Sequence, residues 1–254
     1  KYEFSFLDFL RQARFTNYGL FVIYLSCMNF AVYVAAPFFT PYLLNGLQFN
    51  YLTFTVITSI AIIVKFLVMP IWGWAADIHG NKKVLTVCGF IMPFVPLVWT
   101  LSTDFWYLVL VQIFSGFIWA GFEMASFNFI FDTTTPQKRT TCIAYFNVLN
   151  GLAILAGAML GSFIVKFPPG HWSPYYAVFL VSFLLRYLST LIFMPKIHEV
   201  RTVENISENR LLLKVISTVP YMGSLHHEVH HHIIRRYKKR RKGKRKGRSK
   251  KSRK

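Results

Sequence analysis

Apolar residues fall into six long stretches, separated by short polar linkers. The stretches cover roughly residues 18–44, 51–76, 84–101, 105–131, 140–166 and 175–194. About 20 apolar residues in a helix are enough to cross the roughly 30 Å hydrocarbon core of a bilayer. The pattern therefore predicts an all-α polytopic membrane protein with six transmembrane helices, of which the third is the shortest.

The linkers between these stretches alternate in charge. Residues 45–50 and 167–174 contain no lysine or arginine, whereas 77–83 and 132–139 each contain two. Positively charged loops stay on the cytoplasmic side of a membrane. This pattern predicts that both termini are cytoplasmic, and we expect a plasma (inner) membrane location.

The composition changes along the chain and predicts four regions. The first is a linker or interfacial helix that mixes aromatic and charged residues, the second is the six-span body, the third is an amphipathic segment, and the last is a disordered, His-rich and polybasic tail. Their expected bounds are 1–17, 18–195, 196–225 and 226–254.

Composition excludes a water-soluble globule as the leading interpretation. Apolar residues make up 54% of the chain, and aromatic residues make up 18%. The formal net charge is +19, but residues 235–254 contain 15 of the 29 lysines and arginines, and the rest of the chain carries only +4. We expect this tail to contact anionic lipid, since each basic residue near such a surface contributes about 1 kcal/mol. The spacing of the three cysteines predicts neither a disulfide framework nor a zinc site.

Three ionisable residues lie inside predicted spans, where a charge costs about 2.5–3.5 kcal/mol on insertion scales. They are Lys65, Glu123 and Arg186. In the fourth span, Gln112, Gly116, Trp119 and Glu123 share one helix face. Glu123 is the strongest candidate for a functional residue, because a lone, desolvated carboxylate beside Trp119 suits proton coupling or a cation site.

The other polar residues in the spans are open to two interpretations. Asn29 and Tyr33 share a face of the first span and are candidate binding residues, as is Lys65, for which structure and function are equally good explanations. Asn147 and Asn150 in the fifth span are more typical of hydrogen bonds between helices, and Gly157-x-x-x-Gly161 of close helix packing. For Arg186, a structural pair or snorkelling is favoured over a role in binding substrate.

The linker after the second span has a distinctive sequence, Gly73-Trp74-Ala75-Ala76-Asp77-Ile78-His79-Gly80-Asn81-Lys82-Lys83. Gly80 permits a tight turn, and Asp77 is placed where it can cap a helix N-terminus. The linker resembles the signature loop of the major facilitator superfamily, and the matching positions are Gly73, Ala76, Asp77, Gly80 and Lys82. The stretches Ala36-Pro37-Phe38-Phe39 and Trp119-Ala120-Gly121-Phe122 are similar to the C-terminal six-helix half of bacterial members.

This resemblance covers about residues 15–195 and implies half of a 12-helix secondary transporter. In such a half, the first and fourth helices line the substrate cavity, the second and fifth contact the other half, and the third and sixth face lipid. The chain would move a small solute by alternating access, with no cofactor, metal or enzymatic activity. The coupling ion is open between a proton, as in a symporter, and sodium. The expected partners are the solute, membrane lipids, and an N-terminal half or a second copy. The candidate substrate or proton site comprises Glu123, Gln112, Trp119, Asn29, Tyr33 and Lys65.

Two alternative functions rest on the C-terminal tail. His227-Glu228-Val229-His230-His231 has the H-E-x-x-H spacing of a zinc metalloprotease, although a chance match is expected in so His-rich a tract. The polybasic stretch also suits a membrane-insertion factor or scaffold whose tail docks to a ribosome or to anionic lipid. The six spans resemble neither class, so a transporter half is the leading interpretation.

Overall fold

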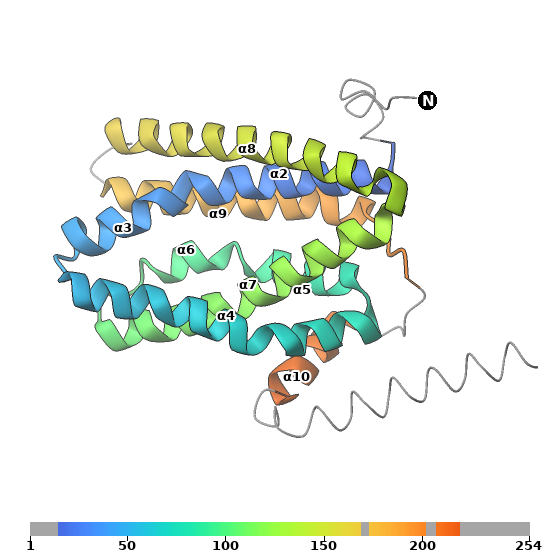
Figure 1. Ribbon diagram of the computed structural model, residues 1–254. Helices are drawn as coiled ribbons and strands as arrows, with labels where there is room; N and C mark the ends of the chain where they lie inside the picture. Colours follow the sequence, from blue (N-terminus) through green and yellow to red (C-terminus); the bar gives the residue numbers. More distant parts are fainter. Residues whose placement is uncertain (1–14, 169–172, 202–206, 219–254) are drawn as a thin grey trace, which may run out of the picture. The chain divides into compact units, whose positions relative to one another are not determined.

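The computed structural model describes residues 15–168, 173–201 and 207–218 (Figure 1). The chain divides into two compact units, residues 1–208 and 209–254. The described helical elements are α2 (Asn17–Ala35), η1 (Ala36–Phe38), α3 (Phe39–Pro41), η2 (Tyr42–Gly46), α4 (Tyr51–His79), α5 (Asn81–Ile91), α6 (Phe94–Val98), α7 (Phe105–Thr133), α8 (Pro136–Lys166), α9 (Pro174–Phe193), η3 (Met194–Lys196) and α10 (Glu208–Thr218).

Six of the described segments are long and apolar enough to cross a membrane, which confirms the predicted fold class. They are Asn17–Gly46, Tyr51–His79, Asn81–Val98, Phe105–Thr133, Pro136–Lys166 and Pro174–Lys196. The third is the shortest, with 18 residues, as the sequence predicts. Several segments that we expected to be single helices consist of shorter helical pieces that follow one another along the chain.

Side-chain caps and prolines set where these helices begin and break. The side chains of Thr16, Asn50 and Asp104 accept hydrogen bonds from backbone N–H groups in the first turns of α2, α4 and α7. Pro93 separates α5 from α6, because proline has no N–H to donate to the preceding turn. Pro70 lies inside α4, which continues through it.

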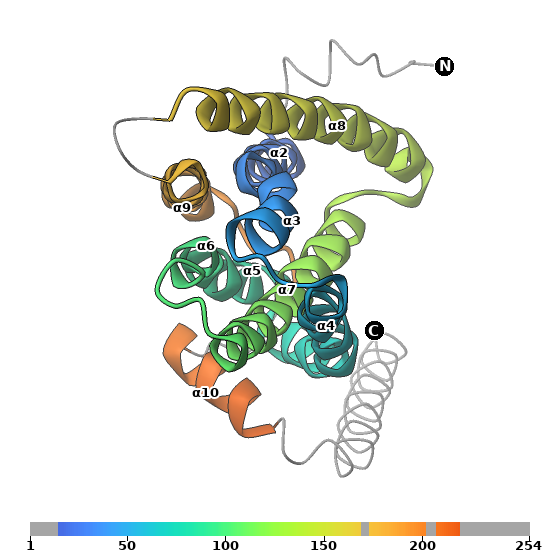
Figure 2. The same ribbon diagram turned by 90° about the vertical axis from the view of Figure 1, so that its left-hand side faces the viewer.

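The six spans form two groups of three helices (Figure 2). In one group α2 packs against both α8 and α9; in the other, α7 packs against both α4 and α5. The groups meet where α5 and α6 contact α9 and where α2 contacts α7. The space that remains between α2 and the α4–α7 pair holds the candidate site described below.

Within the first group, glycines bring α8 very close to α2. A Cβ atom at Gly157 would collide with the backbone carbonyl of Phe30, and one at Gly161 with that of Val34. Gly157 and Gly161 therefore let α8 pack closely against α2, as we expected from their spacing. On the other side of α2, the Ser182 hydroxyl of α9 donates a hydrogen bond of 2.6 Å to the carbonyl of Ala31.

The outer surfaces of α4 and α8 are the most open in the bundle. In an apolar 18-residue stretch of each of these two helices, only 11% is buried. The corresponding share is 44–61% in the other four spans. Large apolar side chains are exposed along both helices, including Phe66 and Leu67 on α4 and Leu152 and Met159 on α8. These faces are suited to contact with lipid or with another membrane-spanning body.

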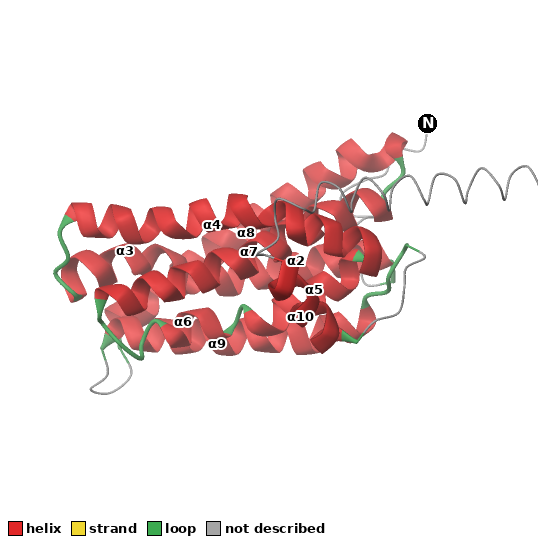
Figure 3. Ribbon diagram, turned by 90° about the horizontal axis from the view of Figure 1, so that it is seen from below, coloured by secondary structure: helices red, strands yellow, loops and turns green. Residues whose placement is uncertain are grey.

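The connections lie at two opposite ends of the bundle (Figures 1 and 3). The α4–α5 and α7–α8 turns, which are followed by Lys82 and Lys138, lie at the end where α2 begins. The linkers around 47–50 and 99–104 lie at the other end. The described linkers that contain lysine and arginine therefore lie at one end of the body, and those without them lie at the other.

Two of the regions predicted from composition are only partly described. Helix α10 lies within 196–225, where the amphipathic segment is expected. The 226–254 tail, and all but three residues of the 1–17 segment, lie outside the described residues.

Candidate functional site

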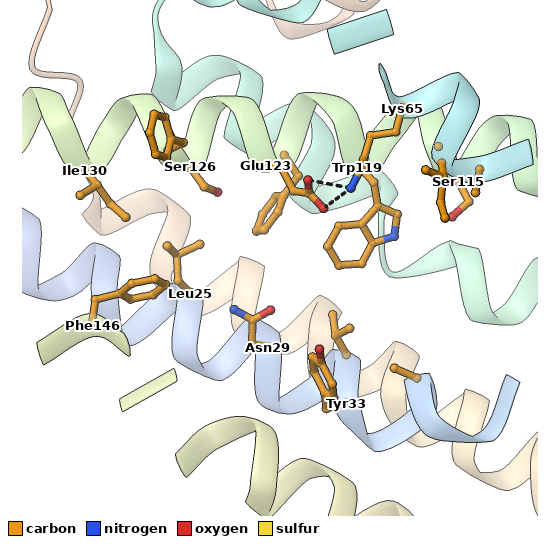
Figure 4. A pocket seen from close by; sticks show the side chains of 17 residues that line it. Leu25, Asn29, Tyr33, Lys65, Ser115, Trp119, Glu123, Ser126, Ile130 and Phe146 are labelled. Atoms are coloured by element: carbon orange, nitrogen blue, oxygen red, sulfur yellow. Dashed lines mark hydrogen bonds and ion pairs between the residues drawn. The ribbon is translucent and has the colours of Figure 1, made fainter. Parts of the chain in front are cut away.

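A cavity with a volume of about 600 Å³ lies between the two groups of helices. It is lined by residues of α2, η1, α4, α7 and α8 (Figure 4). Five of the six candidate site residues line this cavity: Asn29, Tyr33, Lys65, Trp119 and Glu123. The sixth, Gln112, lines a second cavity.

Lys65 and Glu123 form an ion pair across the α4–α7 contact. The Lys65 ammonium donates to both carboxylate oxygens of Glu123, at 3.2 and 3.0 Å (Figure 4). The two side chains remain 25% and 42% exposed, so the pair faces the cavity. We expected Glu123 to be a lone carboxylate, and the structure differs: its charge is balanced by a lysine 58 positions earlier in the chain.

Gly116 allows α7 to approach α4 near this pair. A Cβ atom at Gly116 would lie 2.5 Å from the carbonyl oxygen of Ala61, which is one helical turn before Lys65. The indole of Trp119 lies beside the ion pair, one turn before Glu123 (Figure 4). The stripe predicted on the fourth span thus combines a close helix contact with a polar cavity wall.

Asn29 and Tyr33 line the opposite wall, on α2 (Figure 4). Asn29 donates a hydrogen bond of 2.7 Å from its amide nitrogen to the side-chain oxygen of Asn150 on α8. This contact is the interhelical hydrogen bond that we favoured for Asn150. Asn29 therefore helps to hold α8 against α2 as well as lining the cavity.

The second cavity has a volume of about 230 Å³ and shares wall residues with the first. The shared residues are Val32, Ala36, Ser115 and Trp119. Gln112 of α7 and Arg186 of α9 also line it. Arg186 is only 2% exposed, so it does not snorkel to the bilayer surface.

Sequence reasoning did not place Arg186 at a cavity, although a signal was present. Ser182, Arg186 and Thr190 occupy positions i, i+4 and i+8 of α9, and all three are buried. Polar residues at this spacing form one stripe on a helix, and a polar stripe within a membrane helix faces the protein interior.

The signature-loop residues form a charged cluster at the end of the bundle where α2 begins. Gly80 adopts a φ of 94°, which favours glycine, and joins α4 to α5. Asp77 accepts a 2.9 Å hydrogen bond from the Arg201 guanidinium. The first turn of α5 is capped by Glu199, whose carboxylate accepts a 2.8 Å hydrogen bond from the backbone N–H of Lys82.

Arg201 links this loop to the end of α7. Its Nε lies 2.6 Å from a carboxylate oxygen of Asp132, which also accepts a hydrogen bond from the Asn81 amide. Burial alone would lower the pKa of Arg201, but the hydrogen bonds and charges of Asp132 and Asp77 raise it above its ordinary value. The guanidinium is therefore a fixed positive charge. The roles of Asp132, Glu199 and Arg201 were not predicted from the sequence.

The described ranges contain no group of three or more His, Cys, Asp or Glu side chains that could hold a metal ion. The H-E-x-x-H sequence at His227–His231 lies outside these ranges.

Comparison with known proteins identifies the family. The sequence profile described as Major Facilitator Superfamily matches residues 20–240, which include five of the six described spans entirely and all but the first three residues of the other. A comparison with curated protein sequences finds no match to the chain. The profile covers most of the chain, and members of this family are generally transporters of small solutes rather than enzymes. The chain therefore belongs to the Major Facilitator Superfamily and is an integral, multi-pass membrane protein.

Proposed function

We propose that the chain is one half of a secondary active transporter that moves a small solute by alternating access through the cavity between α2 and α7. The observation that carries this proposal is the Lys65–Glu123 pair in the wall of a 600 Å³ cavity within spanning helices. Ionisable groups inside a membrane protein are costly and mark ion or substrate pathways.

The pair is suited to couple solute movement to a proton. With Glu123 ionised, each charge is balanced by its partner. When Glu123 takes up a proton, the carboxylate loses its charge and the Lys65 ammonium is left to attract another negative group. A proton that Glu123 takes up and releases with each solute molecule would therefore change the charge of the cavity wall.

A second six-helix body is needed to close the cavity. Polar groups such as the Lys65–Glu123 pair and Asn29 are unfavourable against hydrocarbon. Helices α4 and α8 both contribute to the cavity lining, and their open faces provide apolar surface for such a body. We propose that this body is an N-terminal half or, failing that, a second copy of the chain. Loop charge favours cytoplasmic termini. We propose an inner-membrane location.

The test is the pH profile of uptake by the assembled transporter in vesicles. Glu123→Gln keeps the shape of the side chain but cannot ionise, so uptake should lose its pH dependence, or solute binding should be lost, at unchanged expression. Lys166→Gln is a matched control, because Lys166 is an exposed basic residue at the end of α8. If Glu123→Gln transports with the wild-type pH profile, the ion pair serves only the structure.

A further inference from the structure

The second cavity contains a buried positive charge. Arg186 is 2% exposed, and its Nε atom is buried without a hydrogen-bond partner. Among the described residues that line this cavity, Arg186 alone is ionisable, and the other polar groups are neutral: Thr40, Thr58, Gln112 and Ser115. The carboxylate that lines the adjoining first cavity, Glu123, is paired with Lys65.

The position of Arg186 is fixed by its neighbours along α9. One turn earlier, Ser182 bonds to the carbonyl of Ala31 on α2. One turn later, the Thr190 hydroxyl donates to the carbonyl of Gly89 on α5, at 3.0 Å. These bonds attach α9 to α2 in its own group and to α5 in the other, so the backbone that carries Arg186 is held beside the cavity.

A buried cation of this kind requires a negative partner from outside the described chain. The positive charge of an arginine persists even in an apolar protein interior, and its planar guanidinium matches a carboxylate through two parallel hydrogen bonds. A single positive charge is balanced by a monoanion, whereas a phosphate dianion would add an unbalanced negative charge in a low-dielectric site.

The remaining walls indicate what the anion carries. Phe54, Val95 and Trp99 present apolar surface to the 230 Å³ cavity. A chloride ion would leave this surface without a partner. We propose that the second cavity binds a small organic monocarboxylate, with its carboxylate on Arg186 and its apolar body against Phe54 and Trp99. This inference rests on the proposed transport function and names the chemical class of the solute.

The proposal is tested by binding to the purified full chain in detergent, with tryptophan fluorescence as the readout, because Trp99 and Trp119 line the cavity. The probes are sodium butyrate, its neutral analogue butyramide, sodium chloride and inorganic phosphate, at constant ionic strength. We expect a saturable change with butyrate and none with the other three. Arg186→Gln should weaken butyrate binding at least tenfold, while Lys166→Gln should bind like the wild type. An equal response to butyramide or chloride, or no saturable response to butyrate, would overturn the proposal.

A melting measurement, one further variant and two further probes keep the test decisive. Arg186→Gln removes an unpaired buried charge, so its melting temperature without ligand should be no lower than that of the wild type. Thr58→Met keeps Arg186 but fills part of the cavity, and should weaken butyrate binding more than acetate binding. Decanoate represents a membrane fatty acid and should bind no better than butyrate; tighter binding would assign the site to lipid and overturn the solute proposal.

These outcomes are separable from those of the proposed function. Butyrate binding at Arg186 without uptake by the assembled protein would contradict transport and leave the anion site standing. Saturable uptake of another solute without butyrate binding would contradict the anion site and leave transport standing.

Discussion

Neutralising Lys65 and Glu123, singly and together, measures how strongly the two side chains interact. Two unit charges 3.0 Å apart attract by about 5.5 kcal/mol at an effective dielectric constant of about 20. Because the two side chains are 25% and 42% exposed, solvent screens much of this attraction. Pairs exposed to this degree typically contribute about 1 kcal/mol or less, so we expect a coupling free energy of about 1 kcal/mol in the isolated chain.

The assay is a double-mutant cycle with Lys65→Gln, Glu123→Gln and the double variant, each unfolded thermally in the same detergent. Each single variant leaves one charge unpaired in the cavity wall. The double variant should therefore be less destabilised than the sum of the singles, by about 1 kcal/mol. Additivity to within about 0.3 kcal/mol would show that the pair does not interact in the folded protein and would refute this reasoning.

Three further predictions concern helix packing, the charged cluster and topology. Gly157→Ala should destabilise the chain by about 1–3 kcal/mol because its Cβ meets the Phe30 carbonyl. By contrast, Gly151→Ala on the same helix, with no neighbouring atom within 4 Å, should be neutral or stabilising by up to about 1 kcal/mol; equal melting temperatures for the two variants would contradict the packing. Arg201→Gln should lower the melting temperature more than Asp77→Asn, because it removes the ion pair with the largely buried Asp132 as well as the one with the exposed Asp77, whereas Asp77→Asn removes only the second; the reverse order would be inconsistent with the cluster. In a cysteine-free background, an impermeant thiol reagent should label a cysteine at Gln48 from outside and one at Lys82 only after permeabilisation; labelling of the second in intact cells would invert the proposed orientation.

The sequence was sufficient to predict the spans, because each is a continuous apolar run whose ends are marked by caps and charges. It also predicted the role of Gly157 and Gly161, since small residues four positions apart on a membrane helix have few uses other than close packing. The Gln112–Glu123 stripe was visible because its members lie on one helix. That the stripe lines two cavities could not be predicted, because this depends on how α7 packs against the other helices.

Contacts between distant segments could not be predicted in this way. Lys65 and Glu123 are 58 positions apart, and Asp77 and Arg201 are 124 apart, so no local pattern links either pair. Asp77 was expected to cap a helix, but at the first turn of α5 the backbone N–H of Lys82 is bound by Glu199, from after the last span. For Arg186, the stripe with Ser182 and Thr190 indicated an inward face, but the sequence could not show which residues of α2, α6 and α7 complete the cavity beside it.

The central claim is that this chain is one half of a transporter, and the uptake of solute into vesicles tests it most directly. Labelled sugars, peptides and carboxylates would be offered to vesicles that contain residues 1–254 alone or together with an N-terminal six-helix half. The account predicts no saturable uptake by the chain alone and saturable uptake of at least one solute by the pair, because one half cannot enclose the cavity. Saturable uptake by a demonstrated monomer of residues 1–254 would contradict it.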